Sequence, residues 1–219
     1  MRGLSRLVTG CGALLVPMAL TVGAQALAQS ATAPRLVTPV FSQLIMFSLP
    51  PEFKSTKPTY EKNSGSFYIR EQVPEGESLA NWSHMITLSG TRGLATNPNV
   101  TPQALLARMT LDFQRNCPDT FSSNAPGQQK IDGYDAYEVI VSCGRVQSDK
   151  PYGVSAIMLS VKGSNDYYAL QWTERGHDSA QPSPIDVAYW TRQLARLNPI
   201  RLCPIVPGES APYTSCTAR

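Results

Sequence analysis

Four cysteines in the second half of the chain restrict its possible folds more than any other feature: Cys117, Cys143, Cys203 and Cys216. An even number of cysteines in an exported protein is typical of disulfides, and each bond holds two distant segments side by side. Three pairings are possible. A zinc site is the alternative, but the chain lacks a Cys-x-x-Cys pair and a histidine near these cysteines. We therefore predict two disulfides.

The first 28 residues have the layout of a secretory signal peptide. Arg2 and Arg6 precede an uncharged apolar run, and Ala26-Leu27-Ala28 supplies the small residues of a cleavage site. A retained transmembrane anchor is one alternative, although its dense apolar part is shorter than the ~20 residues that span a bilayer. A lipidation box at Cys11 is another. The signal peptide predicts a periplasmic or secreted protein. Cleavage after Ala28 removes Cys11, so the mature protein should contain four cysteines.

Hydrophobic periodicity helps to choose among the three pairings. Apolar side chains recur at helical spacing within residues 101–116, and Cys117 ends that buried helical face. Cys143 lies in an alternating strand segment, on the same face as two valines. A bond between Cys117 and Cys143 is therefore plausible, and a bond between Cys203 and Cys216 would close the proline-rich tail.

The pattern of apolar residues and turn signals predicts strands and two main helices. Thr101-Pro102 starts the first helix, which should run to about Asn116. Ser183-Pro184 starts the second helix, with Asp186 completing a capping box, and Pro199 ends it. The expected strands cover residues 41–49, 66–73, 82–89, part of 118–134, 134–143, 152–161 and 167–173.

Consecutive strands joined by short turns favour an antiparallel sheet with helices packed on it, so the predicted fold class is α+β. We expect an extended lead-in at residues 29–39 and a single domain at 40–200. Residues 201–219 should form an irregular tail closed by its disulfide.

The order strands, helix, strands, helix resembles the Mog1/PsbP-like α/β/α sandwich over most of residues 40–200. This resemblance implies a central antiparallel sheet flanked by helices. Residues 74–87 are also similar to small exported bacterial proteins of unassigned function. Members of the broader fold act mainly as binding or accessory subunits. No site motif of that fold matches this chain, so the resemblance assigns no functional residue.

Charge and hydropathy exclude several classes of partner. Removing 28 of the 219 residues leaves 191, with 17 basic and 16 acidic side chains. The chain has no cluster of lysine and arginine, so nucleic-acid binding is not expected. After the signal, no apolar run approaches the length of a membrane span, so we do not expect an integral membrane protein. The sequence contains no phosphate loop or spaced metal motif, and we predict no cofactor and no metal.

Aromatic residues are the stronger candidates for ligand binding. Tyr168 and Trp172 share one face of an expected strand, and Tyr152 lies on its neighbour. Rings on a sheet can stack on a glycan or peptide, or they can pack beneath a helix. Trp82 follows a polar segment and either anchors a partner or enters the core.

His177, next to Asp178, is a further ligand-binding candidate at the end of a strand, and the alternative is a solvated loop. No catalytic constellation is apparent, because neither a nucleophile elbow nor a marked carboxylate pair occurs. The leading hypothesis is an exported, non-catalytic binding or accessory domain of the bacterial envelope. Its partner would be an envelope protein or a glycan or peptide ligand. The alternative is an envelope hydrolase with an acid or histidine site near His177.

Overall fold

The computed structural model describes residues 34–218, so the predicted signal peptide lies outside the described residues. The described chain forms two antiparallel sheets with few helices, which confirms the predicted α+β class. No helix within this part of the chain is long and apolar enough to cross a bilayer.

The larger sheet has seven strands in the order β3-β4-β5-β9-β8-β7-β6, and every neighbouring pair is antiparallel. Its strands are β3 (Tyr60–Asn63), β4 (Phe67–Gln72), β5 (His84–Thr91), β6 (Phe121–Ile131), β7 (Tyr134–Cys143), β8 (Gly153–Lys162) and β9 (Tyr167–Gly176). The turn at Asp132 and Gly133 joins β6 to β7 with positive φ angles of 47° and 85°, as the Asp-Gly pair predicts.

The smaller sheet has three strands in the order β1-β2-β10: β1 (Arg35–Val40), β2 (Gln43–Ser48) and β10 (Arg201–Pro204). Residues 41–49 were expected to be a single strand, but Phe41 adopts a φ of 53° in the turn between β1 and β2. The expected lead-in therefore contributes a strand of its own. The dense apolar run is central in this sheet, and all six residues of β2 are buried.

Within residues 34–218, four helical segments complete the fold: the 3-10 turn η1 (Leu94–Thr96) and the helices α1 (Pro102–Asn116), α2 (Val187–Ala195) and α3 (Thr214–Thr217). The backbone N–H of Ala104 donates to Thr101 Oγ1 at 3.1 Å, so α1 begins as predicted. The prediction for α2 was wrong by one turn. Asp186 is the N-cap, because its carboxylate accepts the N–H of Tyr189 at 3.0 Å.

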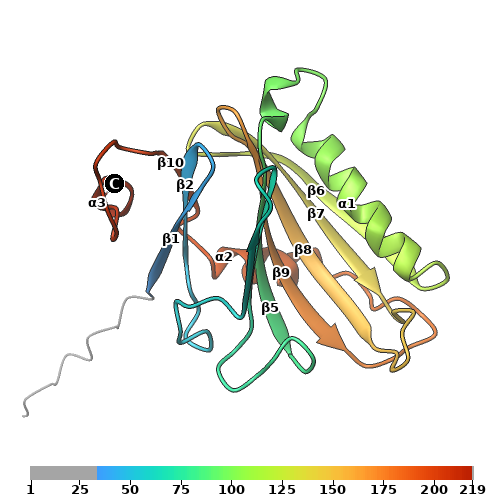
Figure 1. The fold of residues 1–219 in the computed structure, drawn as a ribbon. Helices are drawn as coiled ribbons and strands as arrows, with labels where there is room; N and C mark the ends of the chain where they lie inside the picture. The colour runs from blue at the N-terminus through green and yellow to red at the C-terminus, as the bar shows by residue number, and fades with distance from the viewer. Residues whose placement is uncertain (1–33, 219) are drawn as a thin grey trace, which may run out of the picture. The chain divides into compact units, whose positions relative to one another are not determined.

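The elements form three layers, with the larger sheet in the middle (Figure 1). On one face, α1 packs against β6, β7 and β8. On the opposite face, α2 and the smaller sheet cover the main core, which includes Ile45, Trp172 and Trp190. The structure therefore differs from the expected sheet flanked by helices alone, because a second sheet joins α2 on this face.

Both expected disulfides are present. Cys117 and Cys143 join the end of α1 to the end of β7, with their Cα atoms 5.7 Å apart. Cys203 and Cys216 join β10 to α3, with their Cα atoms 5.6 Å apart. The tail predicted to be irregular thus contains a strand and a short helix, and Cys216 is fully buried.

Candidate functional site

A groove lies beside α1 because one helix is too narrow to cover the larger sheet. Seven strands spaced about 4.8 Å apart span roughly 29 Å, whereas a helix with its side chains is only about 10 Å wide. The helix packs on β6, β7 and β8, so it leaves the same face of β4, β5 and β9 without a helical cover. We call the resulting cavity, of about 460 Å³, the α1 groove.

Small side chains form the floor of the α1 groove. Thr87 and Ser89 of β5 and Ala169 of β9 line it, and each is less than 10 % exposed. Ser89 is directly opposite Ala169 on one side and Ile69 of β4 on the other. Because Ile69 and Phe67 are much larger, they rise above the floor, and Phe67 is 43 % exposed. The result is a depression with an apolar rim.

The helical wall of the α1 groove consists of Leu105, Met109 and Phe113, which recur every four residues and therefore share one helix face. All three are half-buried, whereas Leu106, which points at the sheet, is 1 % exposed. The carboxylate of Asp112 also lines the groove and forms an ion pair with Arg115 at 3.2 Å. This wall is thus mainly apolar.

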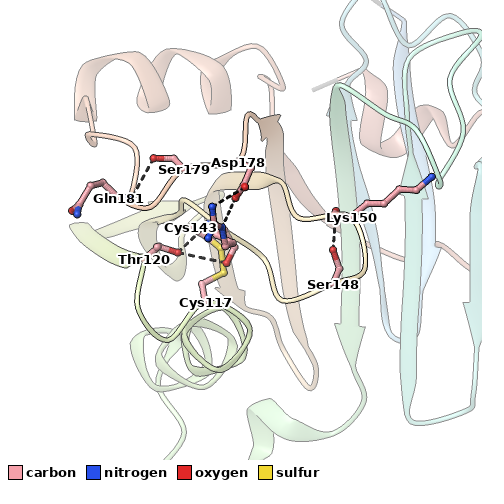
Figure 2. Close-up of polar contacts among 9 residues, drawn as sticks. Cys117, Thr120, Cys143, Ser148, Lys150, Asp178, Ser179 and Gln181 are labelled. Carbon is pink, nitrogen blue, oxygen red and sulfur yellow. Dashed lines mark hydrogen bonds and ion pairs between the residues drawn. A yellow bond between two sulfur atoms is a disulfide. The ribbon is translucent and has the colours of Figure 1, made fainter.

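The Cys117–Cys143 disulfide fixes the helical wall at its C-terminal end (Figure 2). The segment after Cys143 is held next to it, because the N–H of Arg145 donates to Thr120 Oγ1 at 2.9 Å. Val146, in the same segment, lines the groove. The covalent bond therefore fixes the C-terminal end of the helical wall to the end of β7.

Tyr167 closes the floor on β9. It is fully buried, and its hydroxyl donates to the carbonyl of Val100 at 2.6 Å. Burial, and then the negative charge of Asp135, raise the pKa of Tyr167, so the phenol stays neutral and contributes its ring to the cavity.

An aromatic–arginine stack adjoins the disulfide end of the α1 groove, where Tyr152 is part of the lining, since Val154 is paired with both Cys143 and Arg175. The guanidinium carbon of Arg175 is 3.8 Å from the centroid of the Tyr152 ring and 5.9 Å from that of Trp82. The two rings meet edge to face with centroids 6.5 Å apart. Arg175 is the cross-strand partner of Val154, which also lines the groove. A positive charge is therefore held beside an apolar cavity.

The structure separates the aromatic candidates into two pairs. Trp82 and Tyr152 lie together and are both partly exposed, and of the two Tyr152 lines the groove. Tyr168 and Trp172 share a face, as expected, but it is the opposite face of the sheet, where they are 2 % and 0 % exposed. The hydroxyl of Tyr168 donates to the carbonyl of Val40 at 3.2 Å. This second pair packs in the core, beneath the smaller sheet and α2, and does not reach the groove.

His177 is exposed in the segment after β9 and does not line the α1 groove. The neighbouring carboxylate of Asp178, labelled in Figure 2, accepts hydrogen bonds from Nε and Nη2 of Arg145 at 2.5 and 2.8 Å. That ion pair lowers the pKa of Asp178, mainly through the hydrogen bond from Arg145. An aspartate that is held by an arginine is poorly placed to act on the neighbouring histidine.

Sequence reasoning missed most of the groove. Met109 and Phe113 were interpreted as part of a buried helix face together with Leu106 and Cys117, and Leu105 was not singled out. The floor residues are small side chains without a motif. A weak signal for the wall exists in the four-residue spacing of Leu105, Met109 and Phe113. Within residues 34–218, no group of three or more histidine, cysteine or acidic side chains is placed to hold a metal ion.

No protein-family model matches the chain, and no curated protein matches its sequence. Among solved structures, the chain is similar to LpqN of Mycobacterium tuberculosis, a protein involved in cell envelope biogenesis. The TM-score is 0.32 at 10 % sequence identity, and the match covers 78 % of this chain and 81 % of LpqN.

Proposed function

We propose that this protein is an exported, non-catalytic binding domain of the bacterial envelope and that it holds an apolar small molecule in the α1 groove. Export is supported by the leader-like N-terminus and by two disulfides, which form in oxidising compartments. The layered topology also supports the Mog1/PsbP-like sandwich as part of this proposal.

One observation carries the binding proposal: a floor of small, buried side chains lies beneath a rim of large apolar ones. The cavity of about 460 Å³ is within the roughly 300–1,000 Å³ of small-molecule sites. The rim residue Phe67 is 43 % exposed, and contact with an apolar ligand would remove part of its surface from water. A ligand would thus cover β4, β5 and β9 in the way that α1 covers β6, β7 and β8.

The composition of the groove favours binding over catalysis. Of the described residues that line it, none is a histidine or a lysine, and Cys117 is held in a disulfide. A serine nucleophile needs an adjacent general base, and the groove lining places no histidine or lysine beside Ser89. The hydrolase alternative near His177 has no comparable support, because Asp178 is held by Arg145.

Binding of the neutral fluorescent dye N-phenylnaphthylamine tests this proposal. Wild-type protein should bind the dye saturably. Ser89→Phe should weaken binding by about tenfold or more, because the new ring fills the floor between Ile69 and Ala169. Ser123→Phe is the matched control, since Ser123 is an exposed strand residue on β6 and does not line the groove.

Thermal melts establish that each variant folds. If Ser89→Phe does not fold, Thr91→Tyr at the partly exposed end of the floor takes its place. Absence of saturable binding by the wild type would overturn the proposal. Equal affinity of the groove variant and the wild type would do so as well.

A further inference from the structure

Arg175 lacks an acidic partner, whereas four of the ten arginines within residues 34–218 form an ion pair. Arg115, Arg145 and Arg196 each form an ion pair with a carboxylate at 3.2 Å or less. Within residues 34–218, no carboxylate oxygen lies within 4.0 Å of a nitrogen of Arg175. Its side chain has one hydrogen bond to protein, from Nη1 to the carbonyl of Ala80 at 3.3 Å.

The position of this guanidinium is nevertheless set by its neighbours. Its carbon lies 3.8 Å from the centroid of the Tyr152 ring and 5.9 Å from that of Trp82, so two aromatic rings restrict the side chain. A guanidinium has five N–H donors, so one hydrogen bond leaves four of them for water or a ligand. Because the stack restricts the side chain, less rotamer entropy is lost when an anion binds than for a free arginine.

The chemistry of the groove face changes along β9 toward Arg175. Ala169 and Gln171 line the cavity, Thr173 follows on the same face, and Arg175 comes after it. Val154, opposite Arg175, still lines the groove, so the charge is one cross-strand pair from the apolar surface. A molecule lying along this face would therefore meet apolar contacts first and a cation at its end.

We propose that the α1 groove takes a single-chain amphiphile with an anionic head, whose apolar chain lies between α1 and β5 and whose head binds Arg175. This inference rests on the proposed function and adds the chemical class of the ligand. A carboxylate and a phosphate would both satisfy the guanidinium, because each accepts two parallel N–H donors. Asp112, the acidic residue in the lining, is paired with Arg115 and does not cancel the charge of Arg175.

Competition between the neutral dye and three ten-carbon probes tests this inference: decanoate, decanol and decyltrimethylammonium. All three share the apolar chain, so their relative affinities report the head alone. Decanoate should displace the dye about tenfold more effectively than decanol, as expected for one hydrogen bond to a charged group. The cationic probe should be the weakest of the three.

Arg175→Gln should bring the ratio of decanoate to decanol affinity close to one. Arg92→Gln is the matched control, because Arg92 also stacks on a ring, 4.7 Å from the centroid of Phe41, and its removal changes the net charge equally. Arg92 does not line the groove, so this variant should keep the preference. Arg175→Met, which retains the apolar stem over the rings, replaces the glutamine variant if that one does not fold.

The two proposals fail in different ways. Saturable dye binding with equal affinities for decanoate and decanol overturns the anionic head and leaves the apolar groove intact. Retention of the decanoate preference in the Arg175 variants overturns the role of Arg175. A wild-type protein that binds neither the dye nor decanol overturns the proposed function itself.

Discussion

Asp166, in the turn between β8 and β9, joins the two sheets through a buried carboxylate that is 2 % exposed. Its Oδ2 accepts the N–H and the hydroxyl of Ser42, between β1 and β2, at 3.0 and 2.5 Å. Its Oδ1 accepts the N–H of Gly93 at 2.6 Å, and the hydroxyl of Tyr168 lies 3.3 Å from Oδ2. One side chain thus holds three segments that are distant in the sequence.

Asp166→Asn keeps the size of this side chain but replaces one acceptor by an NH₂ donor. Whichever way the amide is turned, its NH₂ faces a backbone N–H, of either Ser42 or Gly93. An unsatisfied donor costs about 1–3 kcal/mol, and the remaining bonds lose the strengthening that a charged acceptor gives. We therefore expect the free energy of unfolding to fall by about 2–4 kcal/mol. For a domain of this size, that lowers Tm by about 5–15 °C.

The pH dependence of this loss is a second readout of the same variant. Burial raises the pKa of Asp166, but the hydrogen bonds from Ser42, Gly93 and Tyr168 outweigh it, so the folded-state pKa lies below its ordinary value. The carboxylate therefore stabilises the fold fully above the unfolded pKa of about 3.9, and this contribution disappears as pH falls through the folded value. The difference between wild type and Asp166→Asn should shrink below about pH 4.

Urea unfolding followed by circular dichroism between pH 3 and pH 7 measures both effects. Asp135→Asn is the matched control, because Asp135 is also paired but its side chain is 69 % exposed. The control should unfold close to the wild type at every pH. A variant at Asp166 as stable as wild type at pH 7, or a difference that persists unchanged in acid, would refute this account of the sheet junction.

Two further predictions concern α1. Replacing both Cys117 and Cys143 by serine should destabilise the protein by about 3.5 kcal/mol in the chain-entropy model, since the bond closes a loop with a sequence separation of 26. Chemical denaturation measures this loss of unfolding free energy. Thr101→Ala should cost about 1 kcal/mol by removing the acceptor for Ala104 N–H. Thr110→Ala in the same helix is its control and should not destabilise, because the Thr110 hydroxyl is buried without a partner among the described residues. A melt in which both threonine variants behave alike would contradict the capping account.

The sequence alone predicted the elements whose signals are local. Thr101-Pro102 located the start of α1 to the residue, because a hydroxyl cap and a proline act within one helical turn. Alternating apolar residues located β4, β7, β8 and β9 for the same reason. The short strands β3 and β10 were missed, because four residues are too few to show a period of two and all of β3 is exposed.

What the tertiary structure decided is which face of each element is covered. Alternation showed that Tyr168 and Trp172 share a face, but only the packing of the smaller sheet showed that this face is the core. The α1 groove exists because a single helix covers half of a seven-stranded sheet, which is a property of the assembly and of no local segment. The stack of Arg175 on Tyr152 and Trp82 likewise joins three segments of the chain. The sequence thus determined where helices and strands form, since those preferences are local. The α1 groove depends on long-range packing, so it was decided only when the layers came together.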